Sequence, residues 1–440
     1  MRVAHVPTPT PNPSPQGGGE HTLRRGVCPG LSAPLPTGDG LLVRMRPIGP
    51  VALAPFEGLC ALAAAHGNGI IEITARGSIQ VRGLTATSAP RFAAEVAALG
   101  IAVEDGVPVR LNPLAGLAEE IVDLTASAAD LRCVLAHRAL AARLSPKISV
   151  VLDGGGAVDM DVLTADVRVR AACSQDDAVL QVGVGGDAAS VVPLGCVAIT
   201  DGTETAVRLL DVLANRGRSA RARDIVMTEG VGPFHSVVAD LLLGDVTPQI
   251  EVRRTDALGV HGLRNGSSAY GIGLTFGHAA ASSLHALIEV AERAGASALI
   301  PAPSRVLIAV GLPSSDGASE FAAQAERLGF IVRADDPRRR VIACAGAPLC
   351  ASGHIATRAL APLIAEALHG KLGTIHLSGC AKGCAHPQKA ALTIVGSVAG
   401  CALIANGSVR DTPFTAVAAE ELSAAIAKFA GALQREARHV

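Results

Sequence analysis

The chain has 440 residues, which is enough for two or three domains with a large core. Its formal net charge is −1, it has no tryptophan and one tyrosine, and its basic residues form no block, so we expect no nucleic-acid partner. Glycines interrupt the long uncharged stretches, and we therefore expect no membrane-spanning helix. One such stretch, residues 390–409, is predicted to form paired strands instead.

The first two dozen residues are rich in proline, threonine and glycine. They contain no apolar run followed by a small-residue cleavage site, so they do not resemble a signal peptide. We expect residues 1–24 to be a disordered leader that the fold does not need, and a misassigned start codon would explain it.

An internal repeat organises the sequence that follows. Residues 66–84 and 294–312 align at an offset of about 228 residues, and each segment runs on into a helix that starts near Phe92 or Phe321. Each copy is predicted to contain a helix, two strands, a second helix and a final strand, which is most of a ferredoxin-like half-domain. Chance similarity between alanine-rich amphipathic segments is the alternative explanation.

A longer segment with alanine-rich helices and glycine-bounded strands follows each copy. The predicted domains are therefore two ferredoxin-like half-domains, at 25–115 and 241–335, and two α/β lobes, at 116–240 and 336–440. The predicted fold class is a duplicated α+β architecture in which these four parts surround a central cleft. A cleft between lobes is a common place for a large ligand.

Two glycine-rich segments, 183–188 and 271–277, each contain a G-x-G pattern. Neither has the preceding strand, the following helix and the distant acidic residue of a dinucleotide-binding fingerprint. We therefore expect electrons to come from an external donor, either an NADH-linked reductase or a reduced carrier.

The strongest chemical signal is a pair of cysteine motifs near the end of the chain. Cys344 and Cys350 form C-x5-C, and Cys380 and Cys384 form C-x3-C. Two close pairs of thiolates can bind one soft metal centre, either a cubane iron-sulfur cluster or a tetrahedral zinc ion. Buried, reduced core cysteines are the alternative.

We favour the cluster because the neighbouring residues are small and let backbone N–H groups approach inorganic sulfide. These small neighbours are Gly346, Ala347, Gly379, Ala381, Gly383 and Ala385. The other cysteines are scattered singly, which suits a reducing cytoplasm. They are Cys28, Cys60, Cys133, Cys173, Cys196 and Cys401.

The duplicated half-domains and the cysteine spacing resemble the sulfite/nitrite reductase superfamily from about residue 25 onward. Within it, residues 26–47, 343–361 and 376–400 are more similar to the precorrin-3B synthase family than to the reductases. The last segment is the most telling. Siroheme reductases more often carry Pro-Asn-Gly between the final two cysteines, where this chain has Ala-Lys-Gly.

The resemblance implies a monooxygenase of aerobic cobalamin biosynthesis. Such an enzyme hydroxylates precorrin-3A with dioxygen at the meso carbon between rings A and D, and a ring-A acetate closes a lactone. It implies a four-iron four-sulfur (4Fe-4S) cluster on Cys344, Cys350, Cys380 and Cys384, and a mononuclear non-haem iron whose ligands no motif identifies. A siroheme-dependent sulfite or nitrite reductase is the main alternative, in which Cys384 would bridge cluster and siroheme. A non-catalytic iron-sulfur carrier is the third hypothesis.

A precorrin is a polycarboxylate macrocycle, so its cleft should present arginine and lysine side chains. By resemblance, the candidate substrate-binding residues are Arg76 and Arg82 in the first half-domain and Lys147 before an Asp-Gly-Gly turn, although Ser145 breaks the usual Leu-Pro of that motif. A solvated surface charge is the alternative for each. The weaker candidates are Arg44, Arg46 and Arg110.

Four histidines are further candidates. His354 and His386 lie close in sequence to the cysteines, so either could contact the cluster or bind the second iron. A structural role is the more common outcome for such residues. His261 and His278, which flank a glycine-rich stretch, are the weaker pair.

Overall fold

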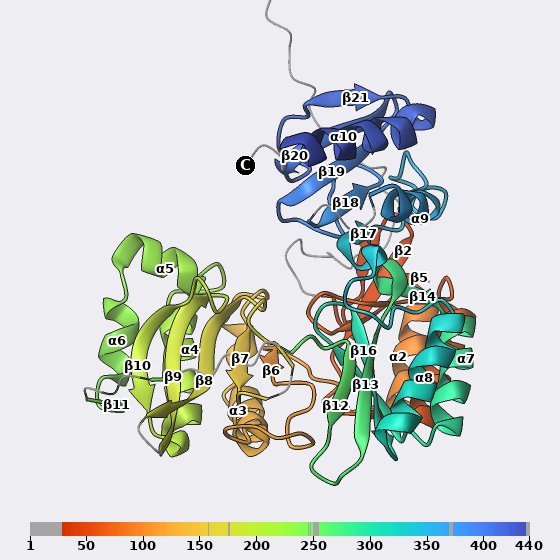
Figure 1. Ribbon diagram of the computed structural model, residues 1–440. Helices are drawn as coiled ribbons and strands as arrows, with labels where there is room; N and C mark the ends of the chain where they lie inside the picture. Colours follow the sequence, from red (N-terminus) through yellow and green to blue (C-terminus); the bar gives the residue numbers. More distant parts are fainter. Residues whose placement is uncertain are drawn as a thin grey trace, which may run out of the picture.

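The computed structural model describes residues 29–156, 158–174, 177–244, 246, 248–249, 255–368 and 373–436. The predicted leader, residues 1–24, lies outside this part of the chain. The described residues form four β-sheets: two belong to the predicted half-domains, and one belongs to each lobe (Figure 1).

The two half-domains exchange an edge strand. Sheet 1 has the order β1 (Leu35–Thr37), β2 (Gly40–Met45), β5 (Ile79–Leu84), β4 (Ile70–Ile73) and β14 (His278–Ala280). Sheet 2 has the order β12 (Gly259–Gly262), β13 (Ser268–Gly273), β16 (Val306–Leu312), β15 (Ala298–Ala302) and β3 (Val51–Ala52). Strand β14 of the second half pairs with β4, and β3 of the first half pairs with β15. Each half therefore completes the sheet of the other.

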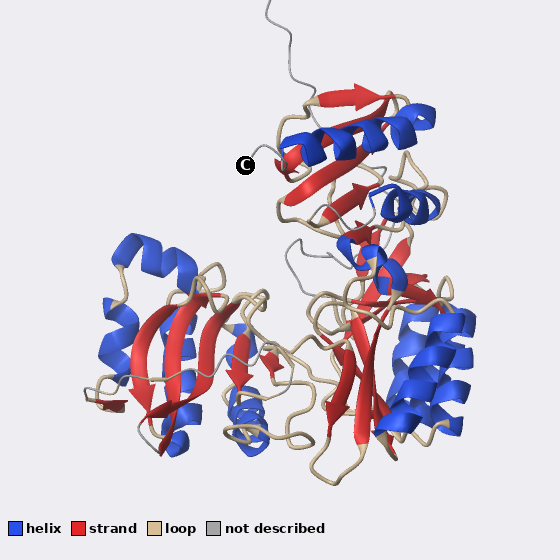
Figure 2. Ribbon diagram, in the orientation of Figure 1, coloured by secondary structure: helices blue, strands red, loops and turns tan. Residues whose placement is uncertain are grey.

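Helices cover one side of the paired sheets (Figures 1 and 2). They are α1 (Leu53–His66), α2 (Ser88–Ala98), α7 (Ala281–Arg293) and α8 (Ser315–Arg327). Helices α1 and α7 start at residues 53 and 281, and strands β4 and β15 start at 70 and 298, so both pairs keep the predicted offset of about 228 residues. The internal repeat is confirmed. Fully buried Phe56, Phe92 and Phe321, from α1, α2 and α8, lie in the core that the helices share with the sheets.

The final strand of each predicted copy is not formed. Residues 101–103 and 330–332 contribute one isolated bridge each, Pro47 to Val103 and Gly273 to Ile331. Proline has no N–H group to extend a ladder, and β13 ends at Gly273 where the chain enters a short 3-10 helix, η3 (Thr275–Gly277).

The first lobe consists of sheet 3 and four helices. Sheet 3 has the order β11 (Leu242–Leu243), β10 (Val192–Val197), β9 (Asp177–Gly186), β8 (Ala165–Ser174), β7 (Val150–Asp153) and β6 (Val109–Arg110). Its helices are α3 (Thr125–His137), α4 (Gly202–Asn215), α5 (Ala222–Glu229) and α6 (Gly232–Val238). The short 3-10 helices η1 (Leu140–Ala142) and η2 (Ile199–Asp201) lie in its connections.

The second lobe, which we call the thiol lobe, consists of sheet 4 and two helices. Sheet 4 has the order β17 (Val341–Ala343), β18 (Ile375–Ser378), β19 (Ala390–Ser397), β20 (Gly400–Gly407) and β21 (Thr415–Val417). The helices are α9 (Thr357–Leu368) and α10 (Leu422–Glu436), with 3-10 helices η4 (Pro337–Arg340) and η5 (Ala419–Glu421). The β19–β20 hairpin confirms the paired strands predicted at 390–409.

The two lobes share one topology. In each sheet three parallel strands, β6–β8 or β17–β19, are followed by antiparallel neighbours. The duplication therefore extends beyond the half-domains, and the duplicated α+β fold class is confirmed. The exact domain limits stay a prediction. Within the described residues, no helix is both long and apolar enough to cross a membrane.

The two central sheets differ in the face that points away from the helices. In sheet 1 this face is polar, because β2, β4 and β5 alternate apolar residues toward the helices with Arg44, Glu72, Gln80 and Arg82 on the other side. In sheet 2 the equivalent face is apolar and packs against the first lobe. That packing joins Ala269, Ile300 and Ile308 to Leu114 and Ala118. Of these two faces, that of sheet 1 is therefore the polar one.

Candidate metal centre and anion-binding face

The fold brings the two cysteine motifs to one edge of sheet 4. Cys344 follows β17, Cys380 follows β18 shortly after its last residue, and the two strands are parallel. The carboxyl ends of neighbouring parallel strands lie at the same sheet edge. The Gly379 N–H donates to Cys344 Sγ over 3.1 Å, and Thr357 Oγ1 lies 3.9 Å from the same sulfur. The residue before Cys380 therefore donates a hydrogen bond to the thiol of Cys344.

The remaining two cysteines extend the group. Burial raises the pKa of the Cys384 thiol, and the charges of Cys380 and Cys344 raise it further, so these sulfurs share one electrostatic environment. Cys350 Sγ lies against the β1–β2 turn, where a Cβ atom on Gly38 would be 2.3 Å away.

Four thiols are a donor set that fits a thiolate-bound metal centre. Among the residues that the structure describes, no group of three His, Cys, Asp or Glu side chains converges closely enough to bind a metal ion. The loops also approach without side chains, because a Cβ on Gly379 would lie 3.1 Å from the Gly346 Cα and 3.3 Å from the Gly353 Cα. Backbone N–H groups can therefore reach sulfur, as Gly379 does.

Glu72 lies at the centre of the polar face of sheet 1. It accepts hydrogen bonds from Arg82 Nε (2.9 Å), Gln80 Nε2 (2.8 Å) and Arg358 Nη2 (3.1 Å). Burial alone would raise the pKa of Glu72, but the charges of Arg82 and Arg358 together hold it below its usual value. Arg358 belongs to α9, so this ion pair attaches the thiol lobe to sheet 1.

The three predicted substrate-binding residues fall on two sides of the molecule. Arg82 lies on the side of the thiol lobe and is held between Glu72 and Asp39, which is 3.2 Å away. Arg76 lies in the exposed β4–β5 loop and donates to the Thr164 carbonyl of the first lobe over 2.9 Å and to the Thr164 hydroxyl. Lys147 is exposed in the first lobe, just before β7.

The weaker arginine candidates gather near Arg76. Arg44 donates to Gln80 over 3.0 Å, and Arg110 donates to the Ser78 hydroxyl over 2.8 Å. Burial lowers the pKa of Arg110 to about 10; the charge of Glu104 opposes this shift, and nearby Arg46, Arg76 and Arg44 reinforce it. An anionic ligand would relieve this repulsion.

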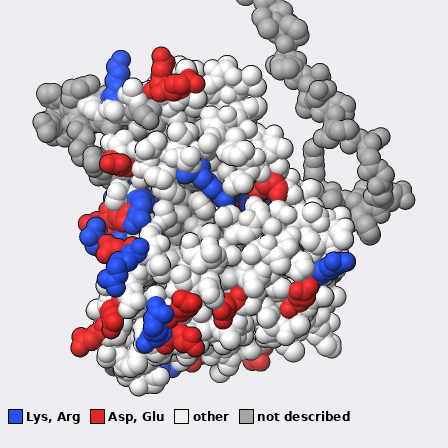
Figure 3. Space-filling model, turned by 90° about the vertical axis from the view of Figure 1, so that its right-hand side faces the viewer, with Lys and Arg blue, Asp and Glu red and all other residues white. Residues whose placement is uncertain are grey.

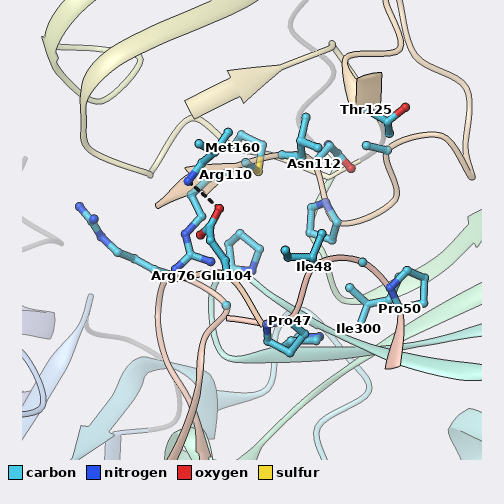
Figure 4. A pocket seen from close by; sticks show the side chains of 18 of the residues that line it. Pro47, Ile48, Pro50, Arg76, Glu104, Arg110, Asn112, Thr125, Met160 and Ile300 are labelled. Atoms are coloured by element: carbon cyan, nitrogen blue, oxygen red, sulfur yellow. Dashed lines mark hydrogen bonds between the residues drawn. The ribbon is translucent and has the colours of Figure 1, made fainter. Parts of the chain in front are cut away.

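A cavity of about 250 Å³ lies beside these cations (Figure 4). Arg110 and Glu104 lie on one side of it, and Ile48 and Ile300 lie on the other. Glu104, which lines the cavity, also pairs with buried Arg46 (3.2 Å). By contrast, the helix-covered side of the molecule shows scattered lysine, arginine, aspartate and glutamate (Figure 3).

The four histidine candidates differ in their burial and in their contacts. His261 is buried with its Nε2 3.1 Å from the Ala257 carbonyl oxygen, which is a structural role, and the His354 side chain is exposed. His278 is neutral because burial and Arg358 lower its pKa to about 4. The His386 ring contacts the His376 ring edge-on, with 5.7 Å between centroids.

Sequence reasoning missed Glu72, Arg305, Arg358 and His376. The alternation of β4 would have placed Glu72 beside Arg82 on one face. Arg305 lies in the repeat's second copy of the loop that carries Arg76, so the alignment could have revealed it.

Comparison with known proteins agrees with this architecture. Residues 33–99 match the family model described as the nitrite/sulfite reductase ferredoxin-like half domain. A precorrin-3B synthase of Sinorhizobium is 35% identical over 426 residues, which cover 94% of this chain and 90% of that protein. The chain belongs to the precorrin-3B synthase family. The relatives of this chain are named as enzymes, and the chain is an oxidoreductase.

Reductases are more distant relatives of this precorrin-3B synthase family member. A ferredoxin–nitrite reductase of Synechococcus elongatus is 24% identical, over 74% of this chain and 70% of that protein. A sulfite reductase [ferredoxin] of Mycolicibacterium paratuberculosis is 27% identical over 41% of this chain and 35% of its own length. The structure of Mycobacterium tuberculosis NirA matches with a TM-score of 0.70 at 20% identity, over 88% of this chain and 79% of NirA, which shows the shared fold.

Replacing Glu72 with Gln should destabilise the protein at pH 7 by about 3 kcal/mol, because part-buried Arg358 loses its carboxylate partner and Arg82 loses one of its two. The lowered pKa of Glu72 means that its contribution is present above the unfolded-state pKa of about 4.3 and is lost as the pH falls through the folded-state pKa. Urea unfolding at pH 7 and pH 4 measures both effects. Glu95→Gln is the control, since half-exposed Glu95 pairs with His66. Equal losses in the two variants would contradict the central role of Glu72.

Proposed function

We propose that this chain is a monooxygenase that hydroxylates precorrin-3A with dioxygen and closes a lactone, the step that forms precorrin-3B in aerobic cobalamin biosynthesis. The observation that carries the proposal is the combination of a cation-bearing sheet face with a four-thiol edge in the adjoining lobe. Family membership at 35% identity over nearly the whole chain supports the reaction type.

The four thiols are the proposed ligands of a 4Fe-4S cluster, which would supply electrons singly when bound. Cys344, Cys350, Cys380 and Cys384 would hold it. A mononuclear non-haem iron is part of the proposal, and we assign it no ligands. The external donor is an NADH-linked reductase or a reduced carrier in the cytoplasm.

Charge on the protein side suits a polycarboxylate macrocycle. Exposed Arg76 and Lys147 are the proposed direct anchors for substrate carboxylates, since both side chains are accessible and Arg76 lines the cavity beside the first lobe. Arg82 is a proposed substrate-binding residue whose orientation Asp39 and Glu72 fix. Fixed cations hold the macrocycle edge in one pose, which is the chain's own contribution to the reaction.

The optical spectrum of anaerobically purified protein, with iron and sulfide analysis and acid extraction of tetrapyrrole, tests the proposal. We expect an iron-sulfur spectrum without siroheme, followed by oxygen-dependent conversion of precorrin-3A to a product heavier by one oxygen atom. Stoichiometric siroheme would instead assign the chain to the sulfite and nitrite reductases, in which Cys384 would also contact the siroheme iron.

Cys384→Ser should lose the cluster and the activity together, because a serine hydroxyl is a poor replacement for a thiolate ligand. Iron and sulfide content, visible absorption and turnover measure the loss. Cys133→Ser is the matched control, since Cys133 is exposed on α3 far in sequence from the motifs. Full activity in a cluster-free Cys384 variant would refute the role of the cluster.

Arg76→Gln and Lys147→Gln should each raise the KM for precorrin-3A about tenfold, because a charge-assisted hydrogen bond contributes about 1.5–3 kcal/mol. Steady-state kinetics separate this effect from kcat. Arg143→Gln is the control in the same segment, where the exposed Arg143 donates to Asn215. An unchanged KM in both variants would favour a carrier or scaffold, which needs no such anchors.

A further inference from the structure

The β15–β16 loop holds Arg305 in a fixed position. Ser304 and Arg305 have left-handed backbone conformations, with φ of 61° and 65°. The Leu274 N–H donates to the Arg305 carbonyl over 3.1 Å, and the Ser304 N–H donates to the Ala75 carbonyl over 3.0 Å. The loop is thus tied both to its own half-domain and to the loop that carries Arg76.

The Arg305 side chain runs toward the thiol lobe. A Cβ atom on Gly277 would lie 2.6 Å from the Arg305 Cδ, and the preceding Phe276 packs in the apolar core of the thiol lobe. Among the described residues, no carboxylate lies within ion-pair distance of Arg305, and none accepts a hydrogen bond from its guanidinium. Burial lowers the pKa of Arg305 to about 10, against the favourable charge of Glu72. An unpaired, half-buried cation is costly for the folded protein.

A second unsatisfied group lies nearby. His376 on β18 is fully buried, and neither ring nitrogen has a hydrogen-bond partner within the described part of the chain. Half-buried His386 lies against it, with its ring 5.7 Å away. Burial lowers the pKa of His376 to about 4, and the charges of His386 and Arg305 add to this shift, so the His376 ring is neutral. A neutral imidazole still offers one N–H donor.

We propose that Arg305, His386 and His376 form an anion-binding site at the junction of the half-domains and the thiol lobe, and that its ligand is a carboxylate. A carboxylate accepts about four hydrogen bonds and matches the guanidinium fork. One such group would satisfy Arg305 directly and supply an acceptor to the histidine pair. The nearby positive charge of Arg305 makes a metal cation a poor ligand for these histidines.

The identity of the ligand rests on the proposed function, because the carboxylate is then one on the tetrapyrrole. Arg76 and Pro303 form an antiparallel bridge, so the loops that carry Arg76 and Arg305 are joined back to back. Arg76 points to the first lobe, where it bonds Thr164, and Arg305 points to the thiol lobe. The two cations therefore project toward different lobes from one joined pair of loops, and in this proposal they bind two carboxylates on different edges of one macrocycle.

Binding of uroporphyrin, a porphyrin with acetate and propionate side chains, to the purified holoprotein tests the site. We expect Arg305→Gln to weaken binding about tenfold by fluorescence titration, and Arg305→Lys to fall between that variant and the original chain. The control Arg333→Gln should stay within about twofold, because Arg333 is exposed beside Asp335. Without ligand, the thermal midpoint of Arg305→Gln should equal or exceed that of the original chain, since an unpaired buried charge is removed.

A parallel titration with citrate at constant ionic strength separates the site from the substrate. If the original chain binds uroporphyrin and Arg305→Gln and Arg305→Lys bind it equally well, the site is wrong while the proposed function stands. If no porphyrin binds but citrate raises the thermal midpoint only when Arg305 is present, the site stands and the proposed substrate is wrong. If neither porphyrin binding nor the effect of citrate on the thermal midpoint depends on Arg305, the proposed site is wrong.

Discussion

The exchange of edge strands between the two half-domains is the constraint on which the rest of the structure depends. Because β14 completes sheet 1 and β3 completes sheet 2, neither half can rotate relative to the other without breaking a ladder. The exchange also presses together the β4–β5 and β15–β16 loops, which bond through Arg76 and Pro303. Both lobes then attach to a rigid centre, and the cations on the loops keep fixed positions.

The duplication has produced one site instead of two. Strand register equates Val109 and Val150 with Val341 and Ile375, so Asn112 occupies the place of Cys344, and Gly155 occupies the place of Cys380. Asn112 has a structural role: its side chain donates to the Val158 carbonyl over 2.7 Å and accepts from the Leu114 N–H over 3.1 Å.

The two half-domain sheets that adjoin the lobes also differ from each other. The outer face of sheet 2 is apolar and covered by the first lobe, while that of sheet 1 keeps Glu72, Arg82 and Gln80. The lobe that lacks cysteines at the two equivalent positions therefore packs against the sheet whose outer face is apolar. The duplicated fold therefore carries one candidate site, where the thiol lobe meets the polar face of sheet 1.

Sequence reasoning reached the features that short patterns determine. The repeat offset, the β19–β20 hairpin and the alternation that places Arg82 opposite the core follow from local periodicity. It could not foresee that Arg358 pairs with Glu72, because that contact spans 286 positions and depends on how α9 docks. Sequence reasoning also failed to foresee that the final strands are missing. At residues 101–103 the limit is set by Pro47 on the facing segment, and the apolar residues of the predicted strand give no sign of it.

The close approach of Gly38 to Cys350 has a consequence for reading related genes. A side chain at position 38 would place its first carbon 2.3 Å from the sulfur, so the loop that carries Cys350 would have to move. A relative that retained all four cysteines but replaced this glycine would therefore have a displaced thiol. Counting cysteines alone would classify such a gene as intact, and the defect would lie in a turn some three hundred codons upstream of the motif.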